Sequence, residues 1–277
     1  MSKTYESNAA HLSYEDTGEG VPIIFLHPTP LDHVYWKPLL AELSGLHAIV
    51  PDLRGHGSSD LGSSLPVGGF TRVPDAPVLS VGQLATDVLA LMDHMGLAEA
   101  VFVGCSIGGY TLLELWRKAP MRMRGLALIC AKPQPDAESN LAKRVETIDR
   151  VRREGTAGVF DGNAKTLISP SAQARRPEIV GELRARMTLT PEAVVAVQAG
   201  LATRPDSIPD IPGIDAPILA ICGGEDPGIV EAEMRAFEAA EGGCEFHLLR
   251  DAGHFAAYEQ PAKIAAILTP WLGQFEF

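Results

Sequence analysis

The sequence has few cysteines and no long apolar run. Only 4 of its 277 residues are cysteines, and they form neither a CxxC pair nor another spacing typical of metal sites. No apolar stretch reaches the length of a membrane-spanning helix, and the first residues lack the apolar core of a signal peptide. We therefore expect no metal, no membrane association and a reduced, cytoplasmic location.

Basic residues are scarce relative to acidic ones. The sequence has 23 Lys and Arg against 35 Asp and Glu, so its formal net charge is −12. This excess of negative charge disfavours nucleic acid or an anionic membrane surface as the main partner. With 46% apolar residues, the chain can bury a full core as one large domain, with room for a subdomain.

One motif, Gly104-Cys105-Ser106-Ile107-Gly108, has a specific chemical meaning. It lies between an apolar run at 101–103, expected to be a buried strand, and an amphipathic helical pattern at 110–117. A G-x-S-x-G sequence at such a turn is typical of a nucleophile elbow, which holds the serine hydroxyl out above a sheet. The glycines suit a crowded turn, and the helix N-terminus offers free N–H groups to an anion. We predict that Ser106 is a nucleophile; the alternative is an ordinary serine in a tight turn.

Two further polar residues follow later apolar runs, in the order Ser, Asp, His. The run 217–222 is followed by Asp226, and the run 244–249 is followed by His254. Open α/β sheets place their ligands at the carboxyl ends of their strands, so both side chains are expected near Ser106. We predict His254 as the general base and Asp226 as the acid that orients it.

The upstream run 23–26 leads into the segment His27-Pro28-Thr29-Pro30. Pro28 has no backbone N–H, so the N–H of Thr29 is the candidate for one oxyanion donor, paired with the N–H of Ile107. The histidine in this loop is expected to have a structural role beside the pocket.

Together these motifs resemble the α/β-hydrolase superfamily, and the resemblance covers nearly the whole chain. It includes the segment from Asp52 to Ser58 (sequence DLRGHGS) after the run 48–50, and the closing Ala252-Gly253-His254. Within the superfamily the chain looks most like the 3-oxoadipate enol-lactonase and carboxylesterase group, on residues 104–110 and the layout of its cap. The resemblance implies a mostly parallel central sheet flanked by helices. It also raises Asp136 as a competing acid, because some members supply the acid after the preceding strand.

The spacing of the motifs predicts a helical insertion. Strands alternate with helical patterns as far as 126–130, and from there to 217 only helical signals occur. We therefore expect residues 1–131 and 215–277 to form the α/β-hydrolase core and residues 132–214 to form a helical cap. Within the cap, two apolar stripes and one capped proline predict three helices, at Leu141 to Val151, Ile179 to Met187, and from Thr190 onward.

The segment 59–79 shows no clear periodicity and is rich in glycine and proline. Structureless loops of this length are uncommon unless they are functional or disordered, so both a lid and a disordered insertion are open. The acyl pocket itself is expected to involve five residues, although apolar side chains at such positions are more often plain core: His27, Trp36, Cys105, Met187 and Phe255.

The resemblance implies a serine hydrolase that cleaves a small carboxylic ester or enol lactone through an acyl-enzyme, without a cofactor. Two other reactions use the same three residues: hydrolysis of a C–C bond in ring-cleavage products, and cofactor-free perhydrolysis. A ligand receptor built on a hydrolase scaffold is a further alternative, because a fold does not fix a function. The partner is in each case a small molecule, and the sequence predicts no oligomeric state.

Overall fold

The computed structural model describes residues 2–63 and 65–275. These residues form an eight-stranded sheet with the strand order β1-β2-β4-β3-β5-β6-β7-β8. Strand β2 pairs antiparallel with both β1 and β4, whereas β4, β3, β5, β6, β7 and β8 are parallel to one another. The strands are β1 (Lys3–Ser7), β2 (Ala10–Asp16), β3 (Pro22–Leu26), β4 (His47–Pro51), β5 (Ala100–Cys105), β6 (Met123–Ile129), β7 (Ile218–Gly223) and β8 (Cys244–Leu249).

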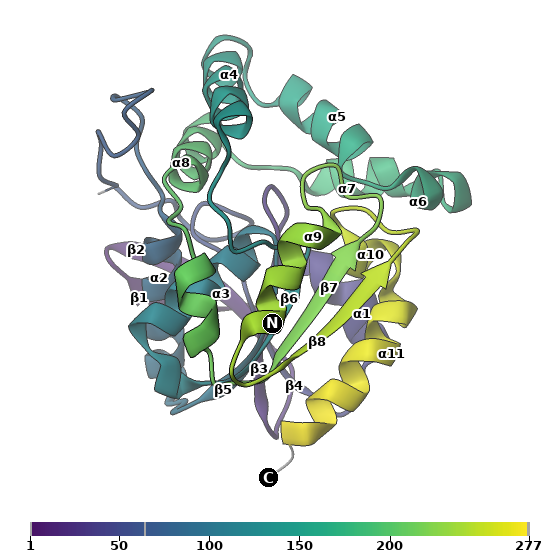
Figure 1. Cartoon of the computed structure of the whole chain (residues 1–277). Coiled ribbons are helices and arrows are strands. Elements are labelled where there is room, and N and C mark those ends of the chain that lie inside the picture. Colours follow the sequence, from purple (N-terminus) through teal and green to yellow (C-terminus); the bar gives the residue numbers. More distant parts are fainter. Residues whose placement is uncertain (1, 64, 276–277) are drawn as a thin grey trace.

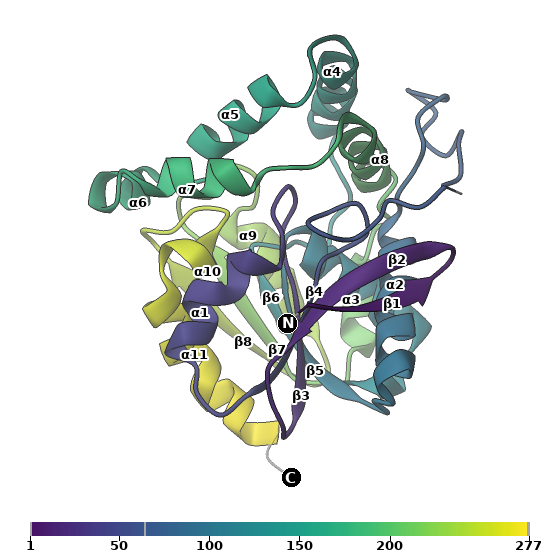
Figure 2. The same cartoon turned by 180° about the vertical axis from the view of Figure 1, so that it is seen from behind.

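The parallel strands are buried because helices cover both faces of the sheet. Every residue of β5 and of β7 is buried, as expected for continuous apolar runs in a parallel sheet. Figures 1 and 2 show α1 (Lys37–Glu42) and α11 (Pro261–Leu272) on one face, and α2 (Val81–Met95) and α3 (Ile107–Lys118) on the other. Two short helices, α9 (Glu231–Met234) and α10 (Ala256–Glu259), follow β7 and β8. This is the mostly parallel, helix-flanked sheet that the sequence predicted.

Residues 130–217, all of which the structure describes, contain helices and no strand. Five of these helices lie above the carboxyl ends of the parallel strands (Figure 1), and we call them the cap helices. They are α4 (Glu138–Glu154), α5 (Ala157–Thr166), α6 (Pro170–Arg175), α7 (Ile179–Arg186) and α8 (Pro191–Ala202). The three predicted helices correspond to α4, α7 and α8, and the Thr190 hydroxyl caps α8 as expected. The division of the chain into core and cap domains stays a prediction.

The segment 59–79 is a packed loop in its described part, which excludes position 64. Phe70 and Val73 are buried, and the N–H of Val78 donates to the carbonyl of Pro66. The segment also contacts two cap helices: the N–H of Leu79 donates to the carbonyl of Ala196 in α8, and its side chains form ion pairs with α4. These contacts join the described part of the segment to α4 and α8, so it is ordered there, and its role as a lid stays a prediction.

None of the described helices is both long enough and apolar enough to cross a membrane.

Candidate active site

Ser106 lies on a sharp turn between β5 and α3. Its φ of +53° and ψ of −117° are strained for a residue with a side chain, and such strain concentrates at functional sites. The turn requires glycine at its neighbours. A Cβ on Gly108 would lie 2.2 Å from the carbonyl oxygen of Leu26, and a Cβ on Gly104 would lie 2.7 Å from the backbone of Gly108. These close approaches explain why the G-x-S-x-G pattern occurs here.

Three side chains from separate strand ends form one hydrogen-bonded chain. His254 Nε2 lies 2.8 Å from Ser106 Oγ, and His254 Nδ1 lies 2.7 Å from Asp226 Oδ2. The second carboxylate oxygen, Oδ1, accepts hydrogen bonds from the N–H groups of Gly228 and Ile229 at 2.8 and 3.2 Å. Because the carboxylate accepts from Nδ1–H, Nε2 is free to accept the hydroxyl proton of the serine.

The competing carboxylate, Asp136, lies elsewhere in the site. Its Oδ2 accepts from Arg144 at 2.9 Å and its Oδ1 accepts from Arg204 at 3.1 Å. These two guanidinium groups outweigh burial and lower the pKa of Asp136. Asp136 has no contact with His254, so the geometry favours Asp226 as the partner of the imidazole.

Charge around His254 stabilises its protonated form. Burial lowers the pKa of this histidine, but the Asp226 carboxylate more than offsets that effect, and Glu259 adds to the increase. The net result is a pKa above the ordinary value for histidine. An imidazole of this kind accepts a proton readily and holds it as the imidazolium.

Two backbone N–H groups lie near Ser106 without a partner in the described residues. The N–H of Ile107 is the first of α3 and has no intrahelical acceptor, and the N–H of Thr29 belongs to the loop after β3. The side chain of Thr29 is fixed by His56, whose Nε2 lies 2.9 Å from the hydroxyl. Since His56 Nδ1 donates to the carbonyl of Arg54, Nε2 must accept from the hydroxyl. Burial lowers the pKa of His56 to about 3, so it stays neutral in this role.

The five residues expected to line the pocket are buried outside it. His27 lies in the loop core, where its Nε2 accepts from the N–H of Leu53 at 2.9 Å. Trp36 packs edge-on against Phe25, and Cys105 accepts a hydrogen bond from the hydroxyl of Tyr35. Met187 ends α7, and Phe255 is fully buried below His254. None of these five is among the described residues that line the cavity beside Ser106. The four apolar side chains among them belong to the hydrophobic core.

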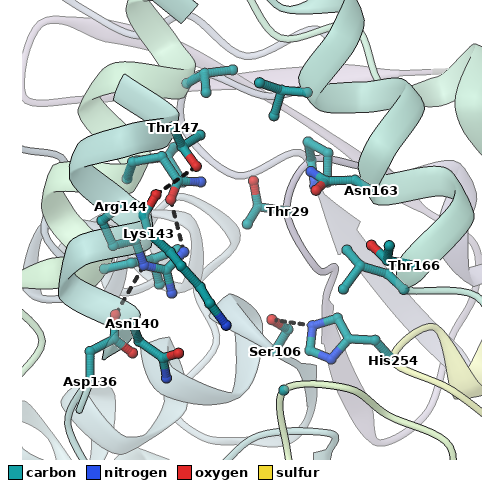
Figure 3. Close-up of a pocket in the computed structure, with 18 of the residues that line it drawn as sticks. Thr29, Ser106, Asp136, Asn140, Lys143, Arg144, Thr147, Asn163, Thr166 and His254 are labelled. Atoms are coloured by element: carbon teal, nitrogen blue, oxygen red, sulfur yellow. Dashed lines mark hydrogen bonds and ion pairs between the residues drawn. The ribbon is translucent and has the colours of Figure 1, made fainter. Parts of the chain in front are cut away.

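The cavity beside Ser106 has a volume of about 430 Å³ and lies between the strand ends and the cap helices. One wall is apolar and includes Val194, Val197 and Leu201 of α8. The adjoining wall comes from α4, which packs against α8, and is polar, with Asn140, Lys143, Arg144 and Thr147 directed into the cavity (Figure 3).

The sequence contained a signal for this polar wall. Residues 140, 143, 144 and 147 have the spacing of one helix face, next to the apolar stripe that begins at Leu141. Such a face is normally solvated, and only the position of α4 above the strand ends turns it toward a cavity. The described residues contain no group of three or more His, Cys, Asp or Glu side chains that could hold a metal ion.

Comparison with known proteins gives consistent matches along the chain. The profile of the Alpha/beta hydrolase family matches residues 23–267. The chain is 26% identical to 3-oxoadipate enol-lactonase 2 of Acinetobacter baylyi, covering 86% of this chain and 84% of that enzyme. It is also 26% identical to 2-succinyl-6-hydroxy-2,4-cyclohexadiene-1-carboxylate synthase of Salmonella heidelberg, over 92% of this chain and 95% of the synthase. Among solved structures, a thermophilic esterase from Thermogutta terrifontis, described with malate bound, has 30% identity and a TM-score of 0.89 over 100% of both chains.

Proposed function

Because the chain belongs to the alpha/beta hydrolase family, we propose that it is a serine hydrolase that cleaves a small carboxylic ester or lactone. The observation that carries the proposal is the chain of short hydrogen bonds from Ser106 through His254 to Asp226, at the floor of the cavity. The family match and the esterase and lactonase neighbours support this class of reaction.

In the proposed mechanism Ser106 Oγ attacks the carbonyl carbon of the ester while His254 Nε2 takes the hydroxyl proton. The imidazolium then gives this proton to the leaving alcohol, which departs and leaves an acyl-enzyme. Water attacks the acyl-enzyme with His254 again as the base, and the acid is released. Asp226 orients the imidazole and stabilises its charged form throughout.

The tetrahedral intermediate carries its negative charge on the former carbonyl oxygen. The N–H groups of Ile107 and Thr29 are the proposed donors to this oxygen, assisted by the dipole of α3. Loss of one such donor typically lowers kcat by about 10²–10³-fold. Residues 132–214 are the proposed cap, and their helices select the acyl group because α4, α5 and α8 supply half of the residues that line the cavity.

An activity screen tests this function. Purified protein is assayed against esters of increasing acyl length and against lactones of several ring sizes, with Ser106→Ala as the control. We expect hydrolysis by the wild type and its loss in the variant, which should fold normally because the hydroxyl contributes little packing. Retention of about a tenth or more of kcat/KM in Ser106→Ala would remove this serine from the role of nucleophile.

A second candidate reaction at the same site follows from the relatives. One relative of equal identity is named a synthase, so the match alone does not select hydrolysis. Hydrolysis of a C–C bond in a ring-cleavage product would use the same three side chains. Turnover of a dienoate ring-cleavage product, without turnover of any ester or lactone in the screen, would favour this second candidate.

A further inference from the structure

The cavity beside Ser106 is cationic although the protein as a whole is acidic. Among the described residues that line it, Lys132, Lys143 and Arg144 oppose a single carboxylate, Asp136. The formal net charge of the whole chain is −12. A cavity of one sign with walls of low dielectric concentrates ligands of the opposite sign. The lining therefore favours an anion.

The ion pairs around the cavity do not neutralise all of its positive charges. Lys132 is neutralised by Glu233. The carboxylate of Asp136, however, is shared between Arg144 and Arg204, so one negative charge offsets two guanidinium groups. The Asp136 and Arg204 side chains are each only 3% exposed, which holds the shared arrangement in place. One positive charge remains at this end of the cavity.

Lys143 adds a second positive charge. Its ammonium group has no hydrogen bond or ion pair with any described residue. Figure 3 shows the side chain extending from α4 into the cavity, with its nitrogen directed toward Ser106. An unpaired ammonium group beside a fixed guanidinium group matches a carboxylate, which forms strong charge-assisted hydrogen bonds with both.

We propose that Lys143 and Arg144 bind a free carboxylate of the substrate, so that the substrate class is an ester or lactone that also carries a carboxylate. The inferred substrate class rests on the proposed hydrolase function, whereas the inferred carboxylate-binding site does not. Asn140 and Thr147 lie on the same face of α4, one turn before and one turn after the two cations, and offer further polar groups to the ligand.

A matched pair of substrates tests the use of this site in turnover. The charged members are the monomethyl esters of unbranched dicarboxylic acids from succinate to suberate. Each neutral partner is the methyl ester whose far carboxylate is replaced by an amide. We expect the ratio of kcat/KM for the best charged ester to that of its neutral partner to fall about tenfold in Lys143→Met. Lys143→Arg should restore most of the ratio.

Lys165→Met is the matched control, because Lys165 is an exposed lysine of cap helix α5 that does not line the cavity. It should keep the wild-type ratio. The wild-type ratio should also fall as ionic strength rises, and more steeply than in Lys143→Met. An equal loss of kcat/KM for both esters in Lys143→Met, or no loss at all, would overturn the carboxylate site.

Binding without turnover separates this inference from the function on which it rests. Calorimetry compares adipamate, which carries one carboxylate, with neutral adipamide, each titrated into Ser106→Ala and into the Ser106→Ala/Lys143→Met variant. Tighter binding of the anion that is lost with Lys143 supports the site, even if the wild type hydrolyses no ester. Equal binding of the two ligands contradicts the site, even if the wild type is an active esterase.

Discussion

The carboxylate of Glu259 accepts a hydrogen bond from the backbone N–H of Gly253, the residue before His254, at 2.9 Å. The same oxygen accepts from the N–H and the hydroxyl of Ser169, which caps α6, at 3.2 and 2.6 Å. The N–H of His254 in turn donates to the carbonyl of Leu167. One buried carboxylate thus joins the loop that carries the histidine to a cap helix.

Glu259→Gln should move the acid limb of the kcat/KM profile to lower pH. Catalysis needs neutral His254, so activity falls as pH drops through the pKa of this histidine. That pKa is set by burial, which lowers it, and by the carboxylates of Asp226 and Glu259, which raise it above the ordinary value. Removing the Glu259 charge lowers the pKa, so the imidazole stays neutral to lower pH. The profile of kcat/KM against pH measures this shift.

Glu225→Gln is the matched control for this experiment. Glu225 also joins a strand end to α6, because its carboxylate accepts from the N–H and hydroxyl of Ser171. Its hydrogen bond to the histidine loop runs from its backbone N–H to the carbonyl of Ala252, which Glu225→Gln leaves in place. Its profile should keep the wild-type acid limb. If the acid limb of the kcat/KM profile stayed unchanged in both variants and Glu259→Gln only lowered the melting temperature, Glu259 would contribute to stability without affecting the pKa of His254.

Asp226→Asn should lower kcat by an amount on the order of 10⁴-fold, because an amide favours the wrong tautomer of the imidazole. Asp136→Asn should retain most of kcat for neutral esters, since Asp136 contacts two arginines and not His254. Steady-state kinetics of both variants decide between the two carboxylates. A severe loss in Asp136→Asn with a mild one in Asp226→Asn would reverse the assignment.

The sequence allowed prediction of the parallel part of the sheet, because its strands are continuous apolar runs that end in motif residues. The antiparallel pair β1 and β2 was not predicted. These strands lie at the sheet edge, where β1 is mostly exposed and mixes polar with apolar side chains. Helices α5 and α6 were also missed, since α6 has only 6 residues and α5 carries glycines within it.

The three hydrogen-bonded residues of the site were predictable because each follows a strand at the same sheet edge. The pocket was not. Its lining depends on how the cap helices are placed over that edge, and side chains such as Lys143 and Gln198 come from helices far apart in the sequence. From the sequence alone a polar helix face is predicted to be exposed to solvent. Only the tertiary structure shows that it lies over a cavity.

Removing one partner of the buried ion pair between Arg54 and Asp87 should strongly destabilise the protein. The guanidinium donates to both carboxylate oxygens at 2.7 and 2.8 Å and also to the carbonyl of Ser7. Both side chains are nearly inaccessible, at 2% and 4%. Asp87→Leu alone should lower the free energy of unfolding by about 3–5 kcal/mol, because it leaves a buried charge without its partner.

The double variant Arg54→Met/Asp87→Leu should lose much less stability than Asp87→Leu alone, since two apolar side chains replace a desolvated pair. Urea unfolding of the single and double variants measures the difference. A loss in the double variant as large as that in Asp87→Leu would show that the pair contributes more than its desolvation cost.

Gly200 lies where α8 meets the end of the segment 59–79, at Leu79. A Cβ at this position would come within 1.7 Å of the carbonyl oxygen of Leu79, so the helix and the segment can approach only because the residue is glycine. The N–H of Leu79 donates to the carbonyl of Ala196 one turn earlier in α8, which fixes the same contact.

Gly200→Ala should therefore lower the free energy of unfolding by about 1–3 kcal/mol, as overpacking does, despite the better helix propensity of alanine. The control is Gly181→Ala in α7, where an added Cβ meets no atom within 4 Å. This control should raise stability by up to about 1 kcal/mol. Because α8 supplies Val194, Val197 and Leu201 to the cavity, Gly200→Ala should also change the ratio of kcat/KM between short-chain and medium-chain esters. Equal stability and equal ratios in the two variants would mean that the segment does not brace α8.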